Sequence, residues 1–253
     1  MVYEMRNGKF AFGRMLGLAL GSGLAAISSA GDLVGDESIM PTGICTEYYN
    51  AKNYQAAWQA CVHAEDPDDP GVNFALGFMA ANGLGTERDD NAAFRYFSAR
   101  SLESDQVTQY NLGLMYLNGR GTRADKREAL VRFRRAASAG HAEAAYNAAR
   151  ILESGEAGSA DYPAAMSYYR KAAFGGIASA MMNLGVMYAR GHGVSQPDMV
   201  EAYAWFACSM RDPSLAAMAK ENRNSAASRL PGKMMEKAEA RAREICRGVK
   251  WNN

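Results

Sequence analysis

The chain has 253 residues, and 48% of them are apolar, so it can bury a sizeable core and is not globally disordered. Its 28 Lys and Arg nearly balance its 27 Asp and Glu, so no overall charge attracts nucleic acid or an anionic membrane. Ala, Met, Leu, Tyr and Gly are frequent while Val and Ile are few, and this composition favours helices over strands.

Residues 1–30 have the pattern of a secretory signal peptide. Three basic residues precede an uncharged run over 15–27, and the small residues Ser28 and Ala30 lie at positions −3 and −1 of the expected cleavage site. The alternative is an uncleaved membrane anchor, but a spanning helix needs about 20 apolar residues, more than this run supplies. We therefore expect a periplasmic or secreted protein that keeps no stable membrane insertion after cleavage.

Residues 31–70 are predicted to form an N-terminal segment and a capping helical hairpin that turns near Asn53. Cys45 and Cys61 each lie eight residues from this turn. Equal distances from the turn of an antiparallel hairpin face each other, so a disulfide fits this pair. The alternative is two buried thiols. The segment DPDDPG at 66–71 predicts a turn before the next element.

A period of 36 residues runs through the middle of the chain. It appears in the turn glycines Gly83, Gly119, Gly155 and Gly191, in the column Gly77, Gly113, Ala149 and Gly185, and in the bulky residues Phe74, Tyr110, Tyr146 and Met182. These columns define four units at 71–106, 107–142, 143–178 and 179–216. Because one helical pair cannot bury its own apolar face, the units are expected to stack into a solenoid.

Each unit is predicted to contain two helices. In 107–142, apolar residues at helical spacing run up to Gly119, which ends the first helix because glycine tolerates the left-handed conformation. Asp125 is placed to cap the second helix, which Gly140 closes. Gly113 lies inside the first helix at a cost of about 1 kcal/mol relative to alanine, so its recurrence indicates that a neighbouring helix approaches closely.

The stretches YNLGLMYLNGRGTRADKREALVRFRRAASAG and NLGVMYARGHGVSQPDMVEAYAWFACS resemble the Sel1-like repeat, a relative of the tetratricopeptide repeat. The resemblance covers about residues 71–216. It implies an all-α fold, a right-handed α/α solenoid with helical caps, and a role as an adaptor in signalling or envelope assembly. The third unit departs from the pattern at Ala149 and Ala157, so we expect wider helix packing, and any hinge, near 149–162.

The first helix of each repeat is expected to line a concave face, where related repeats bind peptides. Helix–groove binding of this kind needs no cofactor, and Arg150 would be available for a carboxylate. The alternative is that the side chains at these positions pack between repeats. By periodicity the face would carry Phe74, Phe78, Tyr110, Leu114, Tyr146, Arg150, Met182 and Val186.

The repeat breaks down after Phe206, and residues 217–253 are predicted to form capping helices, with Pro231 at a helix start. Cys208 and Cys246 remain as a second disulfide pair by elimination. No cysteine lies in a CxxC pair and only Cys61 has a histidine close by in sequence, His63, so a metal or redox site has little support.

The resemblance to the Sel1-like repeat implies two functions of different class. The first is a non-catalytic scaffold or regulator that binds a protein or peptide partner, such as an envelope protein or a sensor ectodomain. The alternative is a cell-wall-fragment or β-lactam-binding protein with weak hydrolase activity. The sequence has no HExxH or GxSxG motif and only three histidines. The Gly119–Gly121 turn follows no strand, so it is not a phosphate-binding loop. We therefore expect no enzyme.

Overall fold

The computed structural model describes residues 33, 43–99 and 102–251, and the predicted signal peptide lies outside the described residues. In this part of the chain all regular structure is helical, with no strand, which confirms the all-α prediction. A first hairpin consists of α2 (Ile44–Asn50) and α3 (Tyr54–Val62). The chain ends on α12 (Ala216–Ala227) and α13 (Gly232–Gly248), which both pack against α11 (Met199–Ser209).

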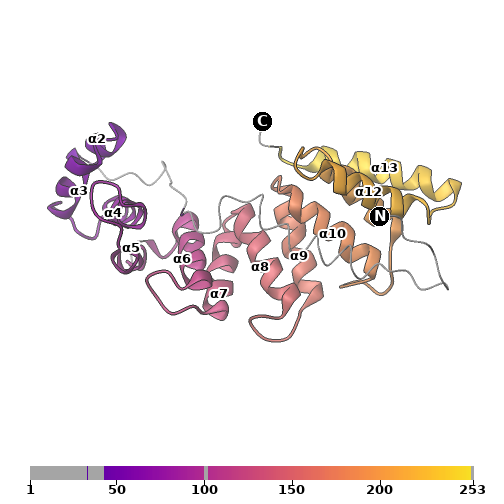
Figure 1. Cartoon of the computed structure of the whole chain (residues 1–253), viewed down its shortest axis with the longest axis horizontal. Helices are drawn as coiled ribbons and strands as arrows, with labels where there is room; N and C mark the ends of the chain where they lie inside the picture. The colour runs from indigo at the N-terminus through magenta and orange to yellow at the C-terminus, as the bar shows by residue number, and fades with distance from the viewer. Residues whose placement is uncertain (1–32, 34–42, 100–101, 252–253) are drawn as a thin grey trace, which may run out of the picture. The chain divides into compact units, whose positions relative to one another are not determined.

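Four helical pairs lie between these ends (Figure 1). They are α4 (Pro70–Asn82) with α5 (Asp90–Phe97), α6 (Gln106–Asn118) with α7 (Lys126–Ser138), α8 (Ala142–Ser154) with α9 (Tyr162–Phe174), and α10 (Ala178–Arg190) with α11. Each first helix packs against its own second helix and against the second helix of the preceding element. The array is therefore an α/α solenoid. Each first helix begins one residue before the unit boundary expected from the period.

The same capping residues recur in every pair. The side chains of Asp89, Asp125, Asp161 and Asp198 accept backbone N–H groups at the start of the second helices. Each first helix ends on a left-handed glycine: Gly83, Gly119, Gly155 or Gly191. The predictions for Gly119 and Asp125 are thus confirmed. These caps satisfy backbone groups that a helix end leaves without partners.

The glycine column inside the first helices faces an aromatic ring of the second helix. A Cβ built on Gly113 would lie 2.5 Å from the ring of Phe133, and one on Gly185 would lie 2.5 Å from Phe206. The close approach expected from the recurrence of these glycines is therefore present. In the third pair, Ala149 occupies this position and is fully buried; the wider packing expected there stays a prediction.

Replacing Gly113 with alanine is expected to lower the free energy of unfolding by about 1–3 kcal/mol, because the added methyl overpacks against Phe133. The same change in an uncrowded helix normally raises the free energy of unfolding by roughly 0.5–1 kcal/mol. The sign of the stability change therefore shows whether the glycine is crowded by its neighbour. Urea unfolding of the variant measures it. Gly232→Ala in α13 is the control, since a Cβ there meets no atom within 4 Å. A Gly113→Ala variant more stable than wild type would contradict the packing.

The turn between the two helices of a pair also contacts the element that precedes the pair. A glycine at this turn lies so close that a Cβ would come within 3 Å of a backbone carbonyl oxygen: Gly85 against Tyr54, Gly121 against Asp90, and Gly193 against Tyr162. Such an approach leaves no room for a side chain. The second turn glycine is therefore required by the contact between neighbouring pairs.

The residue immediately before the second turn glycine, or before Ala157 in the third pair, makes a further side-chain contact with the preceding pair. The chemistry of this contact differs from pair to pair. Because these contacts differ in charge and shape, they are not interchangeable between neighbours. Arg120 donates to Asp90 Oδ1 at 2.7 Å, Glu156 pairs with Lys126 at 2.5 Å, and the His192 ring stacks on Tyr162 with centroids 4.4 Å apart.

Candidate functional site

The first helices are more deeply buried than the periodicity indicated, because each lies between two second helices. Six of the eight side chains expected on the concave face are therefore in the interior and offer a partner almost no surface, which corrects that expectation. These six are Phe74 (1% exposed), Tyr110 (4%), Leu114 (9%), Tyr146 (2%), Met182 (3%) and Val186 (3%).

The buried aromatic residues of this group join the two helices of a pair. The Phe74 ring packs edge-on against Phe97, with centroids 5.7 Å apart. Tyr110 and Phe133 lie at 5.9 Å and Tyr146 and Tyr169 at 5.8 Å in the next two pairs. These rings therefore pack between the two helices of one pair, whereas the alternative interpretation was packing between repeats. The fourth position differs, because Met182 Sδ accepts the Asn222 amide of α12 at 3.4 Å.

The tyrosine hydroxyls of this column bond to the next repeat. Tyr110 hydrogen-bonds with Asn147, and Tyr146 hydrogen-bonds with Asn183 and Ser179 of the following first helix. Burial raises the pKa of Tyr110 to about 12, the negative charge of Glu143 adds to the rise, and the Asn147 amide opposes it. These hydroxyls are thus held neutral and serve to join neighbouring repeats.

The raised pKa of Tyr110 predicts a loss of stability at alkaline pH. Above its ordinary value of 10 the unfolded chain releases this proton, whereas the folded chain holds it up to about 12. Stability is fully present below pH 10 and falls as the pH rises towards 12, by about 1.4 kcal/mol per pH unit for one such group. Urea unfolding over this range measures the slope. Tyr110→Phe should make the slope shallower, and an unchanged slope would exclude Tyr110 as its source.

Two of the eight predicted residues keep exposed surface. Phe78 is half-buried, stacking on Phe74 at 6.5 Å and meeting Tyr49 of α2 edge-on. Arg150 is also half-buried, and its guanidinium lies 5.9 Å from the Tyr146 ring centroid. Among the described residues, Arg150 forms no ion pair. Together they offer an aromatic ring and an unpaired cation, and we call them the first-helix surface.

The four cysteines expected to pair are joined in two disulfides, Cys45–Cys61 within the first hairpin and Cys208–Cys246 between α11 and α13. Within the described ranges, no group of three or more His, Cys, Asp or Glu could hold a metal ion. His141 lies at the start of α8, where its Nδ1 accepts the N–H of Ala144. No helix in the described part is long and apolar enough to cross a membrane.

Sequence analysis missed a pocket at the C-terminal end. It has a volume of about 700 Å³ and is lined by Arg211, Arg243, Cys246, Arg247 and Trp251. The spacing of Arg243, Cys246 and Arg247 places them on one helix face and was the available signal. Arg211 and Trp251 come from segments on either side, and no local pattern connects them.

Comparison with known proteins identifies the repeated unit. The family model of the Sel1 repeat matches residues 72–99, 107–141, 142–173 and 178–209. No curated protein sequence matches the chain. A solved structure of c5321, a protective antigen of uropathogenic Escherichia coli strains displaying an SLR fold, is 26% identical with a TM-score of 0.63. It covers 77% of this chain, and this chain spans 41% of its length.

A second solved structure, a Sel1 repeat protein from Oxalobacter formigenes, is 24% identical with a TM-score of 0.66. The match covers 81% of this chain and 84% of the other. At this identity the likeness shows the fold alone. It agrees with the helical pairs described above.

Proposed function

The chain belongs to the Sel1 repeat family, and on this premise we propose that it is a non-catalytic scaffold or regulator of the bacterial cell envelope that holds a peptide or protein partner on the first-helix surface. Sel1 repeat proteins are in general protein–protein interaction scaffolds. Scaffolds of stacked helices bind partners through side chains that different repeats present at equivalent positions.

The observation that carries the proposal is the exposed surface of Phe78 and Arg150. They occupy the same position of the 36-residue period, two repeats apart, and both keep exposed surface while Leu114 and Val186 at this position are buried. Aromatic side chains and arginine are the types that contribute most to protein interfaces. Arg150 can donate two parallel hydrogen bonds to a carboxylate of the partner.

Two disulfides support an envelope location. Such bonds persist in oxidising compartments, which include the bacterial periplasm and the extracellular space. The structure joins all four cysteines of the chain in pairs. A partner that is an envelope protein or the ectodomain of a sensor fits this location.

Affinity capture from an envelope extract tests the proposal, with the full chain as bait beside a Phe78→Ala/Arg150→Ala variant. We expect one protein to be retained by the wild type and reduced about tenfold or more with the variant. Val131→Ala on the exposed side of α7 is the control, since Val131 is 41% exposed. A partner lost equally with both variants would contradict the assigned surface.

The alternative function has a different signature. A protein that binds cell-wall fragments or β-lactams gains stability by mass action when the ligand is present. A rise in melting temperature on addition of muropeptide or β-lactam, without a captured protein, would therefore replace the scaffold with this alternative.

A further inference from the structure

The C-terminal pocket combines three arginines with one aromatic face. Arg211 follows α11, whereas Arg243 and Arg247 lie on α13, and all three are exposed. The Arg211 guanidinium lies 4.4 Å from the ring centroid of Trp251, which is close enough for a cation–π contact. The pocket therefore has a cationic rim and an apolar wall formed by the indole and Cys246.

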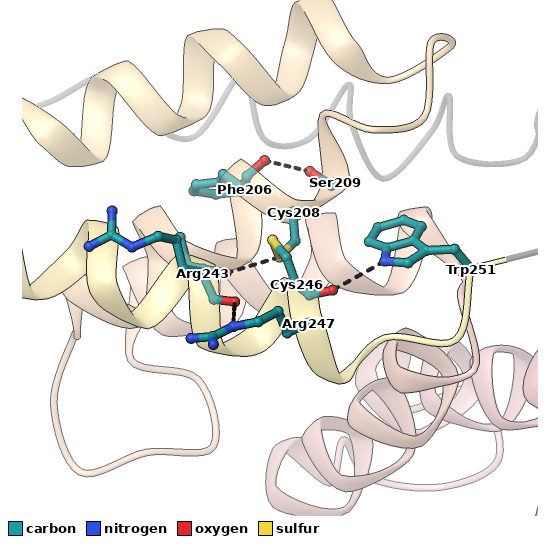
Figure 2. The surroundings of a disulfide bond; sticks show 8 residues. Phe206, Cys208, Ser209, Arg243, Cys246, Arg247 and Trp251 are labelled. Carbon is teal, nitrogen blue, oxygen red and sulfur yellow. Dashed lines mark hydrogen bonds between the residues drawn. A yellow bond between two sulfur atoms is a disulfide. The ribbon is translucent and has the colours of Figure 1, made fainter.

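The walls of this pocket are held in place by one hydrogen bond between them and by bonds to two other parts of the chain. The disulfide ties Cys246 to Cys208 of α11, and the indole Nε1 of Trp251 donates to the Cys246 carbonyl oxygen at 3.1 Å (Figure 2). The backbone N–H of Lys250 donates to the carbonyl oxygen of Phe174 at the end of α9, at 2.9 Å. The apolar wall is therefore already in place before a ligand binds.

The positive charge of the pocket is not neutralised by the chain itself. In the part that the structure describes, none of its three arginines forms an ion pair and no acidic side chain lines it. The acidic residues nearest in sequence are engaged elsewhere, since Asp212 accepts from Ser214 and Glu244 pairs with Arg241. Three like charges left together favour an anionic ligand.

We propose that this pocket binds an acidic peptide segment, with a carboxylate on the arginines and an adjoining apolar side chain against Trp251. The planar guanidinium group matches the two oxygens of a carboxylate, and the indole supplies the apolar contact. Nucleic acid is a poorer fit, because it binds along an extended basic stripe rather than at three cations of one pocket. The inference rests on the proposed function only in that the acidic segment belongs to the protein partner.

Fluorescence anisotropy of a labelled octapeptide of alternating Asp and Leu, titrated with the full chain, tests this pocket. We expect the peptide with Asn in place of Asp to bind about tenfold more weakly or worse. Arg243→Glu/Arg247→Glu should weaken the acidic peptide by a similar factor. Lys233→Glu/Lys237→Glu on α13 is the control, because it makes the same charge change on the same helix outside this pocket. Circular dichroism establishes that each variant is folded.

Equal binding of the Asp and Asn peptides would overturn the proposal. An equal loss of affinity for the acidic peptide in the two charge-reversal variants would also overturn it, since that result would show only a general attraction of the acidic peptide to positive charge on α13. Self-association of the full chain that disappears in Arg243→Glu/Arg247→Glu, with no peptide bound, would also overturn it and assign the pocket to a second copy. None of these results affects capture by the first-helix surface, so the two proposals fail separately.

Discussion

Removing the Cys208–Cys246 disulfide is expected to lower the free energy of unfolding by about 4 kcal/mol. The bond closes a loop with a sequence separation of 38 residues, and the chain-entropy relation gives this magnitude for such a loop. Urea unfolding of Cys208→Ala/Cys246→Ala against wild type measures the change. The bond also joins α11 to α13, so the loss should appear as early unfolding of the C-terminal helices.

The other disulfide supplies a matched comparison. Cys45–Cys61 has a separation of 16 residues, for which the same relation gives about 3 kcal/mol. The Cys45→Ala/Cys61→Ala variant should therefore lose less stability, and its early unfolding should be confined to the first hairpin. A larger loss from the shorter loop would show that loop closure does not determine the contribution of these bonds.

Replacing Gly121 with alanine is expected to lower the free energy of unfolding by about 2–5 kcal/mol. Its φ is +67°, which costs an L-residue roughly 1–2 kcal/mol, and its Cβ would lie 1.9 Å from the Asp90 carbonyl oxygen. Relieving that clash requires a shift between two repeats and adds about 1–3 kcal/mol. Urea unfolding again measures the loss.

Gly119→Ala is the control for this prediction. Gly119 has nearly the same φ, +69°, but the nearest atom to its Cβ would be 3.3 Å away within the same turn. It therefore carries the backbone cost without the clash, and should lose clearly less stability than Gly121→Ala. Equal losses in the two variants would mean that the contact between repeats contributes nothing.

The helical pairs could be predicted because their signals are local. Gly119 and Asp125 mark helix ends by backbone conformation and by side-chain capping, which depend on neighbours within a few residues. Gly113 indicated a close approach because a glycine inside a helix is costly unless packing requires it. The aromatic partner, Phe133, is in the same repeat, so the period carries this contact as well.

The binding surface could not be predicted in the same way. Residues 178–188 of α10 are all buried, so this helix has no exposed face for periodicity to assign, and its polar residues Ser179 and Asn183 are buried as well. Met182 is covered by Asn222 of α12, a contact 40 residues away that follows no repeat. The pocket of Arg211 and Trp251 depends on how the C-terminal segment folds back beside α11, which no short pattern specifies.

The third repeat shows how one substitution changes an interface. Ala157 stands where neighbouring repeats have Gly121 and Gly193, and among the described non-glycine residues only Lys52 has a positive φ. The turn at Ala157 therefore meets the preceding pair in another way, with its carbonyl oxygen accepting from Arg127 Nε at 3.2 Å. The departure was visible in the sequence, but the contact that replaces the glycine was not.

Site-specific photo-crosslinking tests the central claim, that the chain holds a protein partner on its first-helix surface, most directly. A benzoylphenylalanine placed at Phe78 or at Arg150 in the full chain should form an adduct with one and the same envelope protein. The same probe at Val131, which is 41% exposed on α7, should form none. Adducts of equal yield at all three positions, or none at Phe78 and Arg150 while a partner is still captured, would contradict the claim.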